Sequence, residues 1–520
     1  MLKGILTVGG WTMASRVLGF ARDVLVAARL GAGPMADAFF VALQLPNLFR
    51  RLFGEGAFNA AFIPAFSGTL ATQGPRAARD LAERMLALMA VWLSALVALG
   101  ILLMPQIMAL MAPGFTARPE KFALAVELTR ITFPYLLLIC LTALVSGVLN
   151  GLDRFAAAAA APIFFNLLSM AALLALTPYV ATPAHALAWG VTASGVVQLG
   201  LVLWAAAHAG MALRVLRLPS LTPEVRAVLR RMGPGVLGAG VTQLNVVVGL
   251  MIASLLPPGA VSFLYYADRI GQLPLGVIGA AVGTALLPLL SRQLRAGERL
   301  SAHRSINRAV EFALVLCLPA AVGQAAAALP LVQALFQRGA FGPAETAGTA
   351  AALVAYALGL PAFVLVKVFA PGFFARGDTA MPVRIGVATV AVNIALNLLL
   401  SRWFSHVGVA AATTLSAWFN AAMLGGVLLA RGQLVPDRRL RRRAPRLLAA
   451  ALLMGAALLA GQPLLFPQPS GTERLLALAV LVGGGAAVYF GAAHLLRGFD
   501  LREFRGLLRR RRPAGAVATA

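Results

Sequence analysis

The chain has 520 residues, of which 60% are hydrophobic and 12% are charged, and its net charge is +26 at pH 7. Apolar runs of about 20 residues recur along it, the length that a helix needs to cross roughly 30 Å of hydrocarbon. A soluble enzyme of this size does not have such a composition. The chain is therefore predicted to be an all-α polytopic membrane protein.

The apolar pattern predicts about fourteen transmembrane helices. The first starts after Lys3 and continues past Arg16 without a small-residue cleavage site, which favours an uncleaved span over a signal peptide. In chain order the predicted spans cover about residues 5–28, 38–66, 85–111, 122–150, 157–180, 186–208, 232–256, 260–290, 309–336, 347–374, 382–401, 407–430, 447–466 and 474–496.

Basic residues in the loops between these spans predict the orientation in the membrane. With a cytoplasmic N-terminus, 31 of the 44 Lys and Arg residues fall on the cytoplasmic side, 6 on the opposite side and 7 within spans. Cytoplasmic loops of membrane proteins carry such an excess, so both termini are predicted to be cytoplasmic. These basic residues are expected to set the orientation and to contact anionic lipid head groups, which accounts for the net positive charge. No nucleic-acid partner is therefore predicted.

An internal repeat indicates how the spans are organised. Residue types recur at offsets of 222 to 225, as in Phe39 and Phe263, Gly147 and Gly372, and Asp153 and Asp378. A period that contains six spans predicts two six-helix lobes in the same orientation, as in transporters that bind substrate between their repeats. The predicted segments are an N-terminal lobe at 1–220, a C-terminal lobe at 221–430, and two extra spans with a basic tail at 431–520.

Five arginines lie within stretches that otherwise predict membrane-spanning helices: Arg16, Arg22, Arg50, Arg51 and Arg269. A charged side chain at bilayer depth costs roughly 2.5 to 3.5 kcal/mol on the insertion scale, so we expect these side chains to face a cavity inside the protein. Few acids are near them in sequence. The cavity is therefore expected to be net cationic and to suit an anionic passenger.

Enzyme signatures are absent from the sequence. It has no Gly-rich phosphate loop that ends in Lys-Ser or Lys-Thr, so ATP hydrolysis by this chain is not expected. Its five histidines lack metal-ligand spacing, and both cysteines lie within predicted spans. We expect a transporter with no cofactor or metal, driven by the membrane potential, an ion gradient or substrate consumption on the far side.

Several motifs resemble a known family. They are Ser15-Arg16-Val17-Leu18-Gly19-Phe20-Ala21-Arg22-Asp23, Ala36-Asp37-Ala38-Phe39-Phe40, the run from Pro46-Asn47 through Arg50-Arg51 to Glu55-Gly56-Ala57-Phe58, Tyr265-Tyr266-Ala267-Asp268-Arg269, and Lys367-Val368-Phe369-Ala370-Pro371-Gly372-Phe373. Together they resemble the MurJ (MviN) family of lipid II flippases in the multidrug and polysaccharide exporter superfamily.

The resemblance implies a fourteen-helix fold in a bacterial inner membrane and transport of undecaprenyl-diphosphate-linked peptidoglycan precursor to the periplasmic leaflet. It implies substrate contacts at Arg16, Arg22, Arg50, Arg269 and the cavity acid Asp37. It also implies that the two extra spans near 447–496 form a groove for the polyprenyl tail. One departure is Gln272, where the family pattern leads us to expect an acid.

Other charged and polar residues are predicted to support these contacts. Asp23, Asp37 and Asp268 are expected to orient arginines while the cavity is empty. Supporting or gating roles are predicted for Asn47, Arg51, Glu55 and Lys367. Glu127 and Arg130, three apart on one helix face, predict a structural ion pair.

Three alternatives remain open. One is an exporter of another polyprenyl-diphosphate-linked glycan in the same superfamily. A multidrug cation exporter of the same superfamily needs an acidic cavity, so the sign of the charge counts against it. A scaffold that recruits cell-wall synthesis proteins through the arginine-rich cytoplasmic face tolerates loss of the cavity charges. The expected partners are the lipid-linked diphosphate and membrane lipids, together with candidate partners among the cell-wall synthesis proteins. The chain is expected to be a monomer.

Overall fold

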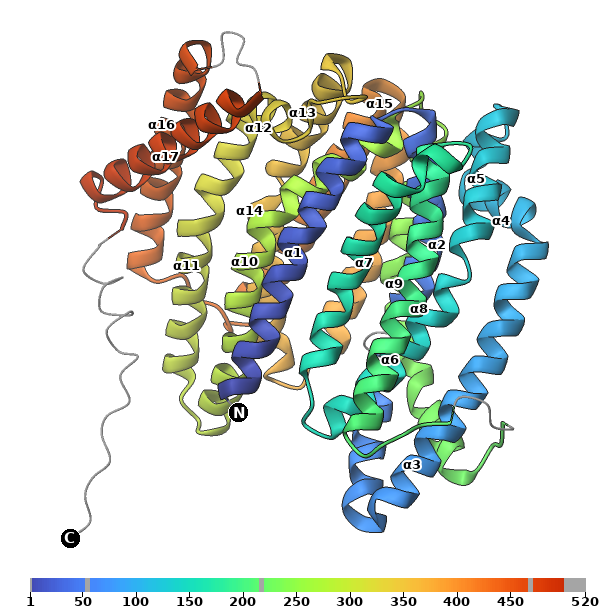
Figure 1. The fold of residues 1–520 in the computed structure, drawn as a ribbon. Helices are drawn as coiled ribbons and strands as arrows, with labels where there is room; N and C mark the ends of the chain where they lie inside the picture. The colour runs from blue at the N-terminus through green and yellow to red at the C-terminus, as the bar shows by residue number, and fades with distance from the viewer. Residues whose placement is uncertain (1, 52–56, 215–218, 466–470, 500–520) are drawn as a thin grey trace. The chain divides into compact units, whose positions relative to one another are not determined.

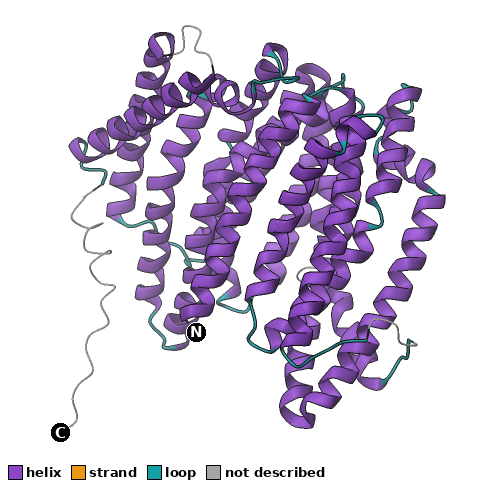
Figure 2. Ribbon diagram, in the orientation of Figure 1, coloured by secondary structure: helices purple, strands orange, loops and turns teal. Residues whose placement is uncertain are grey.

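The computed structural model describes residues 2–51, 57–214, 219–465 and 471–499. Within these ranges all regular structure is helical and no strand occurs, as Figure 2 shows. The prediction of an all-α protein is confirmed. Residue contacts divide the chain into two compact units, which we call unit 1 and unit 2.

Unit 1 comprises Met1–Tyr266, Phe336–Glu345 and Asn397–Val409. Its helices are α1 (Leu2–Leu30), α2 (Pro34–Phe49), α3 (Ala57–Leu102), α4 (Met104–Met111), α5 (Pro119–Thr132), α6 (Tyr135–Gly151), α7 (Ala156–Ala175), α8 (Pro183–His208) and α9 (Pro223–Ser254), with the 3-10 turns η2 (Pro113–Phe115) and η3 (Thr177–Tyr179). The first residues of α10 (Ala260–Arg295) also belong to it.

Unit 2 comprises Ala267–Leu335, Thr346–Leu396 and Ala410–Ala520. It contains α11 (Arg299–Ala326), α14 (Leu360–Phe374), α16 (Arg438–Leu465), α17 (Gly471–Leu495) and most of α10, α12 (Ala328–Phe336) and α13 (Pro343–Ala357). It also contains both ends of α15 (Ala380–Ala430), whose middle part, Asn397–Val409, belongs to unit 1. The division of the sequence after residues 220 and 430 stays a prediction.

Many of these helices have the length and composition of membrane spans. Among the described residues, nine helical segments are long and apolar enough to cross a bilayer. One of them, α15, has a non-helical residue at Ser405, between the spans predicted at 382–401 and 407–430. Neither α1 nor α10 is among the nine, and both carry the arginines and acids noted above. The chain is a multi-pass membrane protein, while the number fourteen stays a prediction.

The sequence repeat reappears in the helix bounds. The broken helix pair α5 and α6 begins at Pro119 and Tyr135, and the pair α13 and α14 begins at Pro343 and Leu360, 224 and 225 residues later. Likewise, α7 and α15 begin 224 residues apart, at Ala156 and Ala380. Each half of the repeat therefore has the same order of helices and the same break within one span.

Several predicted spans are interrupted, which the apolar pattern did not reveal. The span predicted at 38–66 contains most of α2, which ends at Phe49, a π turn at Arg50 and Arg51, and the start of α3 at Ala57, so its continuity stays a prediction. The span predicted at 122–150 breaks at Phe133 and Pro134. A single proline removes a backbone hydrogen bond but lowers the mean hydropathy of a span-length segment only slightly, so a break at a proline escapes a search for apolar runs.

Glycine allows α7 and α8 to approach closely, and Figure 1 shows these helices side by side in unit 1. A Cβ atom added at Gly190 of α8 would lie 2.6 Å from the Cβ of Ala172 and 3.2 Å from the carbonyl oxygen of Leu168. Small residues of this kind let membrane helices pack backbone to backbone.

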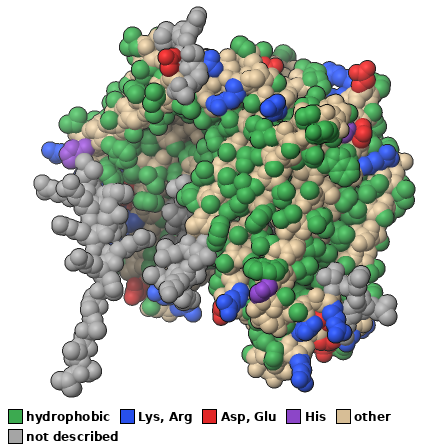
Figure 3. Space-filling view, in the orientation of Figure 1, with side chains coloured by type: hydrophobic (Ala, Val, Ile, Leu, Met, Phe, Trp, Pro, Cys, Tyr) green, Lys and Arg blue, Asp and Glu red, His purple; other side chains and the backbone are tan. Residues whose placement is uncertain are grey.

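The surface fits a lipid environment. On the face in Figure 3, hydrophobic side chains cover the surface between the two ends of the unit 1 helices. Most Lys, Arg, Asp and Glu side chains on this face lie near those ends. Exposed Trp189, Val196 and Trp204 of α8 are examples of side chains that a bilayer would solvate.

Gly190→Ala is expected to destabilise the protein by about 1 to 3 kcal/mol, because the added methyl group overpacks the contact with α7. The matched control is Gly200→Ala on the same helix, where an added Cβ has no neighbour within 4 Å. Thermal unfolding of the detergent-purified proteins measures the difference. Equal unfolding temperatures for the two variants would contradict the close packing.

Candidate functional site

Among the predicted cavity arginines of unit 1, Arg22 in α1 is buried, with a relative exposure of 7%. Its Nε and Nη2 donate hydrogen bonds to Oδ1 of Asp23 at 3.2 and 2.7 Å. Its guanidinium carbon lies 5.0 Å from the ring centre of Phe165, a distance that suits a cation–π contact. Arg22 is thus partnered within the protein, as an arginine at membrane depth requires.

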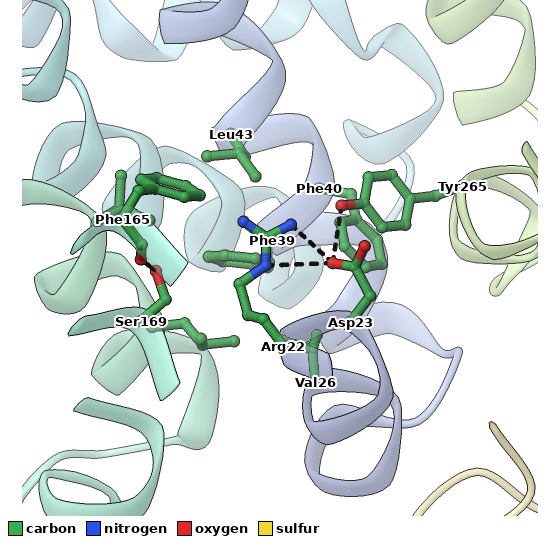
Figure 4. A pocket seen from close by; sticks show the side chains of 11 residues that line it. Arg22, Asp23, Val26, Phe39, Phe40, Leu43, Phe165, Ser169 and Tyr265 are labelled. Atoms are coloured by element: carbon green, nitrogen blue, oxygen red, sulfur yellow. Dashed lines mark hydrogen bonds and ion pairs between the residues drawn. The ribbon is translucent and has the colours of Figure 1, made fainter. Parts of the chain in front are cut away.

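Asp23 connects α1 to the start of α10. The hydroxyl of Tyr265 donates to Asp23 Oδ1 at 3.3 Å, and Figure 4 shows Asp23 between Arg22 and Tyr265. The Tyr265 ring stacks on Phe40 of α2, with ring centres 3.8 Å apart. A small pocket opens among these residues, and its lining is Arg22, Asp23, Val26, Phe39, Phe40, Leu43, Phe165, Ser169, Leu187, Val191 and Tyr265.

Arg16 and Arg50 differ from Arg22 in their surroundings. Arg16 lies on the same helix as Arg22 but is exposed. Arg50 is half-buried at the end of α2, where its Nε donates to Oδ1 of Asn47 at 3.3 Å. The Asn47 amide in turn donates to the carbonyl oxygen of Leu43 at 3.0 Å. Asn47 therefore orients the Arg50 guanidinium, while its supporting role at a substrate stays a prediction.

Two neighbours of Arg50 were also predicted to take part. Arg51 is exposed and lies in the π turn that follows α2. Glu55 lies outside the described residues. Roles for both stay predictions.

Asp37, in the first turn of α2, is 1% exposed and lies at the centre of a polar network. Its Oδ2 accepts from Nζ of Lys121 at 2.7 Å and from the backbone amide of Gly259 at 2.8 Å. Its Oδ1 accepts from the amide and the hydroxyl of Ser262 at 2.9 and 2.6 Å. The carboxylate thus caps the N-terminus of α10, where the helix dipole favours a negative charge.

Four donors occupy the Asp37 carboxylate, so in this conformation it joins segments of unit 1 and presents no open face. Its predicted contact with substrate stays a prediction. Lys121, on α5, is 6% exposed and its ammonium lies 4.0 Å from the ring centre of Phe115. The sequence did not single out Lys121, because the span predicted at 122–150 begins one residue after it and its charge is counted among those of the loops.

In unit 2, the predicted residues of α10 form a local pair. Gln272 donates from Nε2 to Oδ2 of Asp268, one helical turn away. Gln272, which stands where the resemblance leads us to expect an acid, therefore binds the Asp268 carboxylate through its amide. Arg269 is half-buried beside this pair.

Lys367 lies on α14 and is exposed. The end of its side chain contacts α10 at Gly279.

The prediction that Glu127 pairs with Arg130 was wrong. Glu127 Oε1 lies 3.3 Å from Nε2 of His185 on α8, and the Arg130 Nε donates to the carbonyl oxygen of Ile101 at 3.2 Å. The two side chains bind different neighbouring segments, which offer partners that the spacing along one helix does not reveal.

Lys121→Met is expected to destabilise the protein by about 3 kcal/mol, since it leaves a buried carboxylate without its cation while three other donors remain. Asp37→Asn combined with Lys121→Met removes both charges, so this double variant should unfold at a higher temperature than Lys121→Met alone. A thermal double-mutant cycle measures the coupling. Strictly additive effects would contradict a direct ion pair.

The family model described as Lipid II flippase MurJ matches residues 26–480. A "Probable lipid II flippase MurJ" of Rhizobium tropici is 43% identical, covering 99% of this chain and 98% of the relative. The "Lipid II flippase MurJ" of Burkholderia cenocepacia is 34% identical over 97% of this chain and 99% of its own length.

Solved structures share the fold. One is a lipid II flippase MurJ in an inward closed conformation, with a TM-score of 0.78, 23% identity, and coverage of 96% of this chain and 99% of that one. Another is an inward-facing MATE family transporter of the MOP superfamily, with a TM-score of 0.66, 15% identity, and coverage of 82% and 98%. The similarity in sequence extends from end to end, and the chain belongs to the MurJ family of lipid II flippases.

Proposed function

We propose that this protein moves lipid II, the undecaprenyl-diphosphate-linked peptidoglycan precursor, from the cytoplasmic to the periplasmic leaflet of a bacterial inner membrane. Family membership supports the substrate class. The observation that carries the mechanism is the buried guanidinium of Arg22 on α1, held by Asp23 and Phe165 beside a pocket. A cation at this position suits an anionic head group.

The diphosphate of the substrate carries two negative charges, and arginine is the side chain best suited to bind it. Guanidinium groups stay protonated when partly buried and offer paired donors in a plane. In the proposed cycle, Arg16, Arg22, Arg50 and Arg269 each contact the diphosphate. Its arrival replaces the Asp23 carboxylate on Arg22, so one anion is exchanged for another and the cation stays paired.

Transport by alternating access requires contacts that close one side and then open. The network around Asp37 is suited to this, because one carboxylate joins α2, α5 and the start of α10 within unit 1. Opening that side separates the carboxylate from its donors. Because buried ionic contacts are costly to break singly, we infer that they part together and that water enters as they do.

The protein acts in this proposal as a monomeric transporter without enzymatic steps or a cofactor. The driving force comes from the membrane potential, an ion gradient or consumption of the product outside. Cell-wall synthesis proteins are candidate partners at the arginine-rich cytoplasmic face.

A multidrug cation exporter is a weaker candidate despite the fold that this chain shares with MATE transporters. Export of organic cations needs acids that face the passenger. Here Asp23 is bound to Arg22, and Asp37 is bound to Lys121. The polar groups described above therefore favour an anionic passenger.

Arg50→Ala is expected to reduce precursor translocation about 10- to 100-fold, since a hydrogen bond to a charged group contributes about 1.5 to 3 kcal/mol. Arg16→Ala and Arg269→Ala should act in the same direction. Translocation of fluorescent lipid II is measured in proteoliposomes that hold equal amounts of correctly folded protein.

Arg29→Ala is the matched control for these variants, because Arg29 is exposed at the C-terminal end of α1. It removes the same charge and should leave translocation unchanged. Normal turnover by a folded Arg50→Ala protein would remove support for a diphosphate contact and favour a scaffold that does not transport.

The orientation has a separate test. Single cysteines introduced at residues 432–445, in the connection from α15 to α16 and the first turns of α16, are expected to react with an impermeant maleimide only from the cytoplasmic side. A cysteine at 338–341, between α12 and α13, should react only from outside. Labelling in the reverse pattern would overturn the proposed topology and the direction of transport.

A further inference from the structure

Lys367 is the one charged residue in the sequence of α14, and it belongs to an apolar segment, Pro343–Phe374, that is long enough to span a membrane. A lysine at bilayer depth costs roughly 2.5 to 3.5 kcal/mol on the insertion scale, so such residues usually mark a functional site. The Lys367 side chain is exposed. The position of its ammonium group therefore indicates where such a functional site would lie.

Gly279 of α10 determines where the Lys367 side chain lies. A Cβ atom built on Gly279 would be 2.5 Å from Nζ, 2.9 Å from Cδ and 3.2 Å from Cε of Lys367. The end of the lysine side chain therefore packs on one buried residue of α10, in the space that a larger side chain would fill. Both helices belong to unit 2 at these positions.

This glycine shares a stripe of α10 with the polar pair described above. Gln272 and Gly279 follow Asp268 by 4 and 11 residues, and these spacings place the three residues within about 40° of one another around a helix. Arg269 lies ten residues before Gly279, or about 15 Å along the axis at 1.5 Å per residue. Unit 2 therefore offers cations at two levels of α10, too far apart to hold the same phosphate group.

We propose that Lys367 is a second diphosphate-binding residue of unit 2 and that Gly279 is the positioning residue that places its ammonium group. The proposal rests on the proposed function and adds a second level at which unit 2 contacts the head group. Arg269 and Lys367 bind the diphosphate at different stages of its passage. A lysine suits a transient contact, because its ammonium is a compact point charge on a flexible stem.

The experiment measures binding of undecaprenyl diphosphate to the full-length protein in detergent by native mass spectrometry. Lys367→Met keeps most of the length of the side chain and removes its charge, and we expect the dissociation constant to rise about 5- to 20-fold. Gly279→Ala should raise it at least about 3-fold, because the new methyl group displaces the ammonium.

Gly271→Ala is the matched control on the same helix. A Cβ there has the Cβ of Tyr356 as its nearest neighbour, at an ordinary 3.9 Å. Both glycine variants gain the same helix propensity, so a difference between them reports the contact with Lys367. Thermal unfolding should be similar for both, because the atoms that a Cβ at 279 meets belong to a flexible side chain.

A double-mutant cycle separates positioning from general damage to the fold. If Gly279 acts through Lys367, adding Gly279→Ala to Lys367→Met has no further effect on binding. An additional loss in that background, or normal binding by Lys367→Met, would overturn the inference. If Arg50→Ala weakens binding while Lys367→Met does not, the inference fails and the proposed function stands; if neither variant weakens binding, the proposed function fails.

Discussion

A charge inside an apolar helical bundle must find its partner within the protein, because the lipid around the bundle offers none. This constraint accounts for the polar contacts of unit 1. Arg22 is paired with the next residue of its own helix and with an aromatic ring. Asp37 draws its partners from two other segments, α5 and the start of α10. Both sets of contacts give a charged side chain partners in an apolar setting, but they differ in how many segments of the chain they join.

The number of segments that each set of contacts joins determines what changes when the contacts break. Breaking the contact between Arg22 and Asp23 leaves α1 intact, so a phosphate can replace the carboxylate without moving a helix. Breaking the contacts of Asp37 frees three segments at once, because its two oxygens hold a lysine, a hydroxyl and two backbone amides. In the proposed cycle, the first pair exchanges one anion for another and the second holds one side closed.

Much of the fold was predictable because hydropathy and repetition are properties of the sequence itself. The offset near 224 in residue types is the offset between the starts of α5 and α13. Breaks such as the one at Pro134 were not predicted, since apolar residues continue across them. Within the site, the pairs Arg22 with Asp23 and Asp268 with Gln272 lie at spacings that one helix permits. The pair Asp37 and Lys121 is separated by 84 residues, and only helix packing brings it together.

The contact between Gly279 and Lys367 was hidden for the same reason, and it bears on the meaning of Gln272. Along α10, the negative charge of Asp268 is balanced by Arg269, and the Lys367 ammonium adds a further positive charge at Gly279. The amide of Gln272 supplies a hydrogen bond to Asp268 without a charge of its own. An acid at this position would bring the sum of these charges to zero. Glutamine keeps it positive, which under the proposed function favours the approach of an anionic head group to unit 2.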